Sequence, residues 1–166
     1  DRVFLEIKKK IGGIVTKRRV SMTLAESDAY LADRTKPECH KYITEQVFRE
    51  LDAFLDHYPI APKQYISYQR EAFFGKYDND FRLTFDRKIT ERRYDLGLNY
   101  ESYGNYIIGA DHRLMEIKVS NAIPDWLVAK LSELGIYKIN FSKYGRAYQN
   151  FEQSQTESSA QTETSH

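Results

Sequence analysis

Cysteine is almost missing from this 166-residue chain, and two well-known phosphate-binding motifs do not occur in it. The single cysteine, Cys39, excludes a disulfide framework and a metal site built from cysteines. The four histidines lack the spacing of metal ligands. The sequence contains neither a P-loop nor a G-x-G-x-x-G run, so it lacks both kinds of glycine-rich phosphate-binding loop.

Long apolar runs and a strong charge of one sign are lacking too. No segment is apolar over the roughly 20 residues that a membrane-spanning helix needs, and no signal peptide opens the chain. We therefore expect a cytoplasmic protein without direct membrane insertion. The net charge of +1 is far from the basic balance of a general nucleic-acid binder, so we expect no nucleic acid as partner.

Length and composition predict one domain followed by a tail. Residues 152–166 contain three Glu and no Lys or Arg, and they are rich in Ser, Thr and Gln, which is typical of a disordered acidic tail. Residues 1–151 then carry a charge of +4, from 25 Lys and Arg against 21 Asp and Glu. Because a predicted strand begins almost at the first residue, we expect the domain at 1–151 to be truncated at its N-terminus.

A hairpin with one apolar and one charged face is predicted near the N-terminus. Residues 3–10 and 14–22 alternate between apolar and polar side chains, and Gly12-Gly13 between them indicates a tight two-residue turn. Side chains two residues apart in a strand share a face. The apolar face is therefore expected to pack on helices, while the other face collects charge.

On the charged face, the predicted register puts Lys8 opposite Lys17 and Glu6 opposite Arg19. Directly opposed like charges are unfavourable, which favours an anion bound between the two lysines. A solvated face with splayed lysines, which discourages edge-to-edge pairing of sheets, would produce the same pattern. The hairpin alone leaves both interpretations open.

Capping and periodicity signals predict the remaining elements. Thr23 and Glu26 form a capping-box pattern that begins a short helix. An apolar stripe predicts a longer helix at 41–57. Ser142 is a candidate cap for a final helix that ends near Tyr148. Further strands are predicted at 63–74, 81–87, 89–98, 106–109 and 113–120, and a further helix at 124–134.

The later strands repeat the pattern of one apolar and one charged face. Arg70 and Arg82 alternate with other side chains in their strands, and Glu116 shares a face with Lys118. An ordinary ion pair between Arg82 and Asp86 is an open alternative. Closing these strands into a barrel would collect cations in one cavity, where a phosphate chain would offset their repulsion. The carboxylates there would suit Mg²⁺ or Mn²⁺, which bridges carboxylate and phosphate.

Seven short runs, in one order and with similar spacing, resemble the VTC domain. They read FLEIKKK, IVTKRRVSM, YQREAF, FRLTFDR, LMEIKV, IPDWLV and FSKYGRAY. This is the polyphosphate-polymerase domain of the vacuolar transporter chaperone complex and its bacterial relatives, in the triphosphate tunnel or CYTH-like group. The resemblance spans residues 3–148 and implies an α+β fold. It also implies an antiparallel, triphosphate-tunnel-like β-barrel with flanking helices, here incomplete at the N-terminus.

The resemblance also implies a function. The domain would transfer the γ-phosphate of ATP to polyphosphate with Mn²⁺ or Mg²⁺ as cofactor. The implied catalytic residues are Lys8, Arg70, Arg82 and Lys118. The implied substrate-binding residues are Lys17, Arg19, Ser142 and Lys143. The implied metal ligands are Glu116 and Glu6.

Two other functions fit the same residues. One is a triphosphate hydrolase of the same tunnel group, in which water replaces the polyphosphate acceptor. The other is a non-catalytic module that binds polyphosphate or a nucleotide. ATP and polyphosphate or triphosphate are the expected partners in all three, and the sequence identifies no membrane-protein partner.

Overall fold

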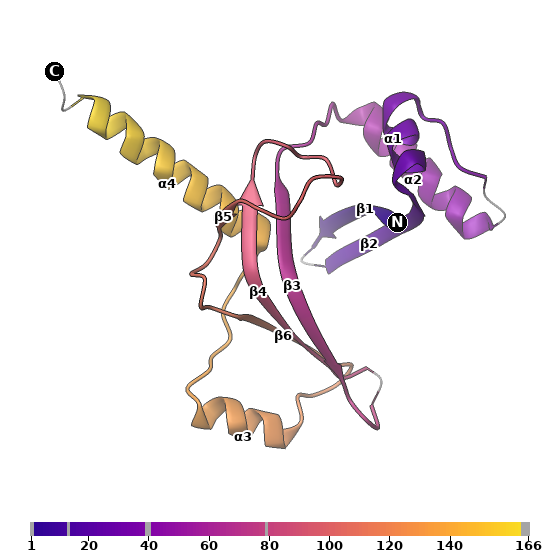
Figure 1. The fold of residues 1–166 in the computed structure, drawn as a ribbon. Helices are drawn as coiled ribbons and strands as arrows, with labels where there is room; N and C mark the ends of the chain where they lie inside the picture. The colour runs from indigo at the N-terminus through magenta and orange to yellow at the C-terminus, as the bar shows by residue number, and fades with distance from the viewer. Residues whose placement is uncertain (1, 13, 39–40, 79, 164–166) are drawn as a thin grey trace. The chain divides into compact units, whose positions relative to one another are not determined.

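The computed structural model describes residues 2–12, 14–38, 41–78 and 80–163, and the chain divides after Pro62 into two units (Figure 1). Unit 1 is residues 1–62 and unit 2 is residues 63–166. The predicted α+β class with antiparallel sheets is confirmed. The described strands form a two-stranded sheet in unit 1 and a four-stranded sheet in unit 2, and they do not close into the predicted barrel. The reason is that the first two strands pair only with each other.

The hairpin of unit 1 has the predicted register. β1 (Arg2–Ile11) pairs antiparallel with β2 (Ile14–Thr23), and every pairing that the sequence predicted is confirmed. Gly12 has a φ of 57°, in the left-handed region that glycine adopts without strain. Gly13, the second residue of the predicted turn, lies outside the described residues.

Two helices cover the apolar face of this hairpin, as predicted. They are α1 (Leu24–Asp33) and α2 (Tyr42–His57). The core of unit 1 consists of Ile7, Val20, Met22, Tyr30, Val47, Phe48 and Leu51. Burying each large apolar side chain contributes roughly 1.5–3 kcal/mol, so this face of the hairpin is fixed toward the helices and its charged face points away from them.

The predicted capping box begins α1. The Thr23 hydroxyl accepts a hydrogen bond from the Glu26 backbone N–H at 3.2 Å, and the Glu26 carboxylate accepts one from the Thr23 N–H at 2.7 Å. These bonds satisfy two backbone donors that the first turn of a helix otherwise leaves without partners. The α1 boundary is thus set by local sequence.

A buried hydrogen bond joins α1 to α2. Tyr30 is fully buried, and its hydroxyl donates to Asp52 Oδ1 at 2.7 Å. The Lys36 ammonium lies 2.5 Å from the other carboxylate oxygen. Burial and the bond to Asp52 both raise the pKa of Tyr30. The hydroxyl therefore stays protonated and keeps its role as donor.

Tyr30→Phe is expected to lower the free energy of unfolding by about 1 kcal/mol, because it removes one hydrogen bond and keeps the ring. Tyr42→Phe is the matched control, since the Tyr42 side chain is 74% exposed. Its effect should stay below about 0.5 kcal/mol. Urea titrations followed by circular dichroism measure both. Equal effects of the two substitutions would show that the bond to Asp52 adds no stability.

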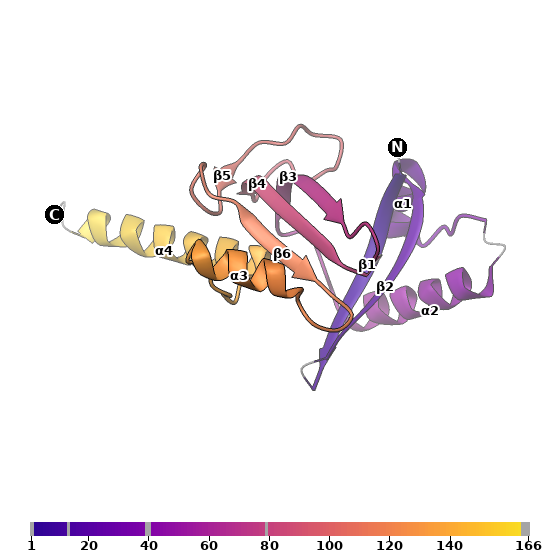
Figure 2. The ribbon, with the colours of Figure 1, turned by 90° about the horizontal axis from the view of Figure 1, so that it is seen from below.

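The sheet of unit 2 is built around its longest strand. β4 (Arg82–Arg92) pairs antiparallel with β3 (Tyr65–Phe74) along one edge. Along its other edge lie β5 (Asn105–Tyr106) and β6 (Leu114–Lys118), and Figure 2 shows β6 beside β4. All described pairings in this sheet are antiparallel, so each strand presents alternate side chains to its two faces.

The prediction of two strands at 81–87 and 89–98 is wrong, because β4 is continuous to Arg92. The β3–β4 pairing shifts between Ser67 and Gln69, and Lys88 on β4 has a φ of 50°. An extra residue in one strand of an antiparallel pair is a β-bulge, which bends the strand without ending it. The boundary predicted near residue 88 is therefore a bulge inside one strand.

Arg92 organises the loop that follows β4, and sequence reasoning did not single it out. Its side chain is only 2% exposed, and it lies between the rings of Tyr65 and Tyr103, at 3.7 and 4.2 Å from their centroids. It donates hydrogen bonds of 2.8–3.2 Å to the carbonyl oxygens of Tyr94, Asp95, Glu101 and Tyr103. The guanidinium thus ties four carbonyl groups of the loop to one buried side chain.

Two helices follow the sheet. α3 (Asp125–Glu133) lies where a helix was predicted, and α4 (Lys143–Glu163) is longer than predicted. It continues past Tyr148 through most of the stretch expected to be disordered; residues 164–166 lie outside the described residues. No glycine or proline follows Gly145, and Gln, Glu and Ala are adequate helix formers. None of the described helices is both long and apolar enough to cross a membrane.

Candidate functional site

One face of the four-stranded sheet carries four of the predicted site residues. The β3–β4 register places Arg70 opposite Asp86, and the β4–β6 register places Arg82 opposite Lys118. Glu116 precedes Lys118 by two residues on β6 and shares its face. The predicted grouping of these residues on one face is confirmed. We call this surface, together with Lys143 described below, the charged face of unit 2.

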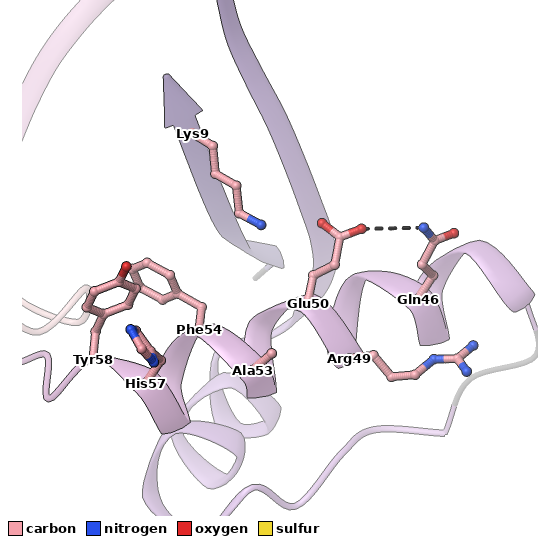
Figure 3. A pocket seen from close by; sticks show the side chains of 8 residues that line it. All are labelled: Lys9, Gln46, Arg49, Glu50, Ala53, Phe54, His57 and Tyr58. Carbon is pink, nitrogen blue, oxygen red and sulfur yellow. Dashed lines mark hydrogen bonds between the residues drawn. The ribbon is translucent and has the colours of Figure 1, made fainter. Parts of the chain in front are cut away.

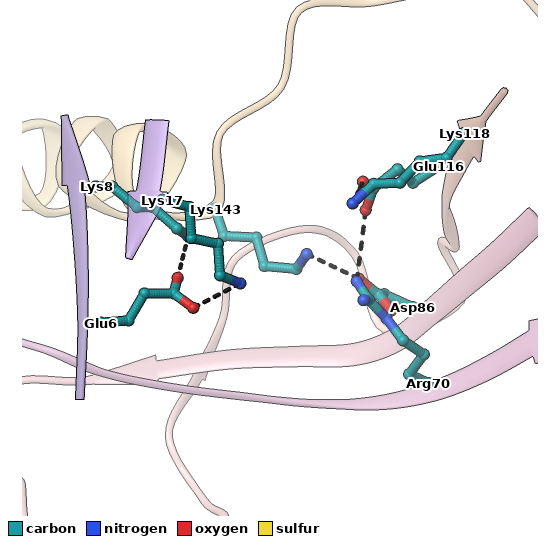
Figure 4. A network of polar contacts seen from close by, with 8 residues as sticks. All are labelled: Glu6, Lys8, Lys17, Arg70, Asp86, Glu116, Lys118 and Lys143. Atoms are coloured by element: carbon teal, nitrogen blue, oxygen red, sulfur yellow. Dashed lines mark hydrogen bonds and ion pairs between the residues drawn. The ribbon is translucent and has the colours of Figure 1, made fainter. Parts of the chain in front are cut away.

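The carboxylate of Asp86 is the centre of this face (Figure 4). It is 1% exposed, and Arg70 donates to its two oxygens from Nε and Nη2 at 2.6 and 2.7 Å. The Lys143 ammonium lies 2.7 Å from Oδ2. Burial by itself would raise the pKa of Asp86, but the hydrogen bonds from Arg70 and Lys143 outweigh it and lower that pKa. The open alternative of an Arg82–Asp86 pair is therefore wrong.

Lys143 reaches this carboxylate because of how α4 begins. The Ser142 hydroxyl accepts a hydrogen bond from the Gly145 N–H at 3.2 Å, so Ser142 caps the helix as predicted. One turn further on, Ala147 is fully buried against Ile89 and Ile107. This contact fixes the start of α4 against the sheet, and the Lys143 side chain is only 18% exposed.

The ring of Tyr68 lies against the same two cations. Its centroid is 5.1 Å from the Arg70 guanidinium carbon and 4.5 Å from the Lys143 nitrogen. A cation over an aromatic face is attracted to it. Tyr68 thus adds an aromatic contact to each of the cations that Asp86 holds.

The outer part of the face has looser pairs. The Lys118 ammonium lies 3.2 Å from Glu116 Oε1, and Arg70 Nη2 lies 3.6 Å from Oε2. Both side chains of the Glu116–Lys118 pair are about half exposed. Arg82, directly opposite Lys118, has no ion-pair partner within the part of the chain that the structure describes. Two opposed cations with a single nearby carboxylate leave this end of the face electropositive.

The other predicted residues form a second group, on the hairpin of unit 1. The Glu6 carboxylate contacts both Lys8 and Lys17 (Figure 4). It lies 3.4 Å from Lys8 Nζ and 2.5 Å from Lys17 Nζ. Burial opposes the charged form of Glu6, but the hydrogen bonds from these lysines outweigh it and lower its pKa. The Arg19 guanidinium stacks on Phe4 at 4.7 Å. The opposed lysines therefore share a carboxylate of the chain itself, and their pairing does not by itself require an external anion.

The carboxylates of Glu6 and Glu116 are the predicted ligands of a divalent cation. Among the described residues no three His, Cys, Asp or Glu side chains gather into a metal-binding group. Mg²⁺, however, is commonly held by one or two carboxylates while substrate phosphates and water complete its shell. Glu116 is half exposed, and its pairs with Lys118 and Arg70 are loose, at 3.2 and 3.6 Å, so it fits such a single-carboxylate site. Glu6 is already engaged by Lys8 and Lys17, so an ion there would have to displace a lysine.

Unit 1 also has an open hollow, shown in Figure 3, which contains none of the predicted site residues. It is lined by Lys9, Gln46, Arg49, Glu50, Ala53, Phe54, His57 and Tyr58. The hydrogen bond within it joins the Gln46 amide to Glu50 on the next turn of α2. It has no convergent set of cations or carboxylates, so the charged faces remain the candidate sites.

Sequence reasoning missed the role of Asp86. Its place on the charged side of the strand was visible from the alternation of residues 81–87, but its partners were not. Arg70 lies opposite it only in the β3–β4 register, and Lys143 comes from a helix much later in the chain. A register worked out from the β3–β4 hairpin would have found Arg70, whereas no local signal points to Lys143.

Comparison with known proteins identifies the family of the chain. Searches against curated proteins and solved structures found no match. The family model of the VTC domain matches residues 1–152, which include both units' charged residues and the start of α4. The chain therefore belongs to the VTC domain family.

Proposed function

We propose that the charged face of unit 2 binds the phosphate groups of ATP and polyphosphate, and that the domain transfers the γ-phosphate from one to the other. The observation that carries this proposal is the opposed pair of Arg82 and Lys118, of which Arg82 has no ion-pair partner among the described residues. Such opposition is unfavourable unless an anion lies nearby. Phosphate oxygens suit it, because Arg binds them in a bidentate manner and Lys as a point charge.

The charge balance of the face supports a polyanionic ligand. Its four cations are Arg70, Arg82, Lys118 and Lys143, and its two carboxylates are Asp86 and Glu116. The face therefore carries a net charge of +2, and Arg82 is its one cation without an ion-pair partner among the described residues. A triphosphate group offers several negative oxygens to a row of cations, which a single carboxylate ligand does not.

Phosphoryl transfer requires little covalent chemistry from the protein. A terminal oxygen of the acceptor chain forms the new bond to the γ-phosphorus while the bond to ADP breaks. Positioning and charge neutralisation supply most of the catalysis. In our proposal Arg82 and Lys118 bind the transferred group, and Arg70 and Lys143 hold neighbouring phosphates. No nucleophilic side chain is needed.

Glu116 is the proposed ligand of Mg²⁺ or Mn²⁺. When bound, the ion would neutralise charge on the phosphates beside it. Glu116 would hold the ion at the half-exposed end of the face, next to Lys118. We also propose that the site lies in a triphosphate tunnel. The support for the tunnel is that the chain belongs to the VTC domain family.

Incubation of the protein with ATP and Mn²⁺, followed by separation of polyphosphate from free phosphate, tests the activity. Accumulation of polyphosphate is the expected result. Release of free phosphate alone would replace the proposal with the triphosphate hydrolase. Binding of tripolyphosphate without any turnover would replace it with the non-catalytic module.

Tripolyphosphate is expected to raise the melting temperature at low salt, because a ligand that binds only the folded state stabilises it. High salt should reduce the shift by screening the charges.

Arg82→Ala should weaken binding by about 1.5–3 kcal/mol, since it removes a charge-assisted hydrogen bond. Lys130→Ala, which removes an exposed cation on α3, is the matched control and should leave binding unchanged. Equal losses in both variants would mean that binding follows net charge and that no site exists on this face.

A further inference from the structure

The least exposed charged group on the charged face of unit 2 is a carboxylate, although the proposed ligand is an anion. Asp86 is 1% exposed and lies on β4, the central strand of the sheet. Burying a carboxylate costs free energy unless it is paired and hydrogen-bonded. Here it accepts bonds from Arg70 and Lys143, two of the cations that the proposed function assigns to phosphate.

The hydrogen-bond geometry leaves donors on both cations. A guanidinium has five N–H donors and an ammonium has three. Asp86 takes two donors of Arg70, from Nε and Nη2, and one of Lys143. The carboxylate therefore fixes both side chains without using up their capacity to bind a second anion.

Fixing these two side chains matters for affinity. Long, flexible side chains lose rotamer freedom when a ligand immobilises them, and that loss subtracts from the binding free energy. A side chain already held by the protein loses less. The Tyr68 ring restrains the same two cations, at 5.1 and 4.5 Å. Both contacts make Arg70 and Lys143 preorganised.

We propose that Asp86 is a positioning residue, whose buried carboxylate holds Arg70 and Lys143 in the arrangement that binds a triphosphate chain. The inference rests on the proposed function of this face. In this role the negatively charged Asp86 promotes ligand binding through Arg70 and Lys143 and does not touch the ligand itself. A mere counter-charge would do the opposite and weaken the binding of an anion.

Asp86→Asn separates these two roles. The amide keeps the shape but removes the charge, and it presents an N–H₂ group to one of the cations. We expect the affinity for tripolyphosphate at low salt, measured by isothermal titration calorimetry, to fall at least tenfold, although the face gains one net positive charge. Unchanged or tighter binding by a folded Asp86→Asn protein would overturn the proposal. Failure of the unsubstituted protein to bind would instead overturn the proposed function.

A double-mutant comparison distinguishes positioning from a general structural role. If Asp86 acts through its partners, Asp86→Asn should have almost no further effect on affinity once Arg70 and Lys143 are both replaced by Met. Arg82 and Lys118 keep the remaining binding measurable at low salt. The same loss in both backgrounds would show that Asp86 only maintains the fold, and would overturn the proposal.

A second pair of variants tests the idea if Asp86→Asn does not fold. Arg70→Lys keeps the charge but loses the two parallel bonds to Asp86, whereas Arg82→Lys loses no such anchor. Both lose the same planar fork toward phosphate. We expect Arg70→Lys to reduce tripolyphosphate affinity at least tenfold. The reduction caused by Arg82→Lys should be several times smaller than that. Equal losses in the two variants would count against a positioning role for Asp86.

Discussion

Glu116→Gln is expected to reduce metal-dependent turnover by about 100-fold or more while tripolyphosphate binding without metal is kept or becomes tighter. A metal ion supplies several kcal/mol of charge stabilisation, and each 1.36 kcal/mol is about tenfold in rate. The amide keeps the shape of Glu116 but loses the charge that would hold the ion. It also releases Lys118 and Arg70, which lie 3.2 and 3.6 Å from the carboxylate, for the phosphates.

The measurement is a pair of tripolyphosphate titrations, with and without Mn²⁺, together with the turnover assay. Glu133→Gln is the matched control, because Glu133 is an exposed carboxylate that also pairs with a lysine, Lys130, but lies on α3. It should change neither binding nor turnover. If Glu116→Gln weakens metal-free binding as much as Arg82→Ala does, Glu116 is only an ion-pair partner and the metal assignment is wrong.

Arg92→Met is expected to lower the free energy of unfolding of unit 2 by about 3 kcal/mol or more. The substitution keeps an apolar side chain between the rings of Tyr65 and Tyr103 but removes every hydrogen bond to the loop carbonyls. Hydrogen bonds to a charged group contribute about 1.5–3 kcal/mol each and are not additive.

Urea titration followed by circular dichroism measures this effect, with Arg113→Met as the matched control. Arg113 is an exposed arginine of the same unit, so its replacement should change stability by less than about 0.5 kcal/mol. Hydrogen exchange adds a local readout. Amides in residues 93–104 should lose protection first, since Arg92 holds that segment. A similar effect of both substitutions would show that the buried guanidinium does not organise the loop.

The parts of the fold that were predicted correctly are those with local signals. The hairpin register follows from the glycine turn signal after Ile11, and the α1 boundary follows from the Thr23–Glu26 capping box. Both depend on residues a few positions apart. The same reasoning divided β4 into two strands, because a bulge at Lys88 depends on how β3 pairs with β4.

The sequence by itself determined which charged residues share a face. A strand has a period of two, so the positions of Arg70, Arg82, Glu116 and Lys118 in their strands place them together once the strands pair. Only the tertiary structure decided how these charges are partnered. The docking of α4 brings Lys143 to Asp86. The strand register pairs Asp86 with Arg70, and Arg82 has no ion-pair partner among the described residues. Partner choice depends on contacts between segments far apart in the chain, and no local pattern encodes those distances.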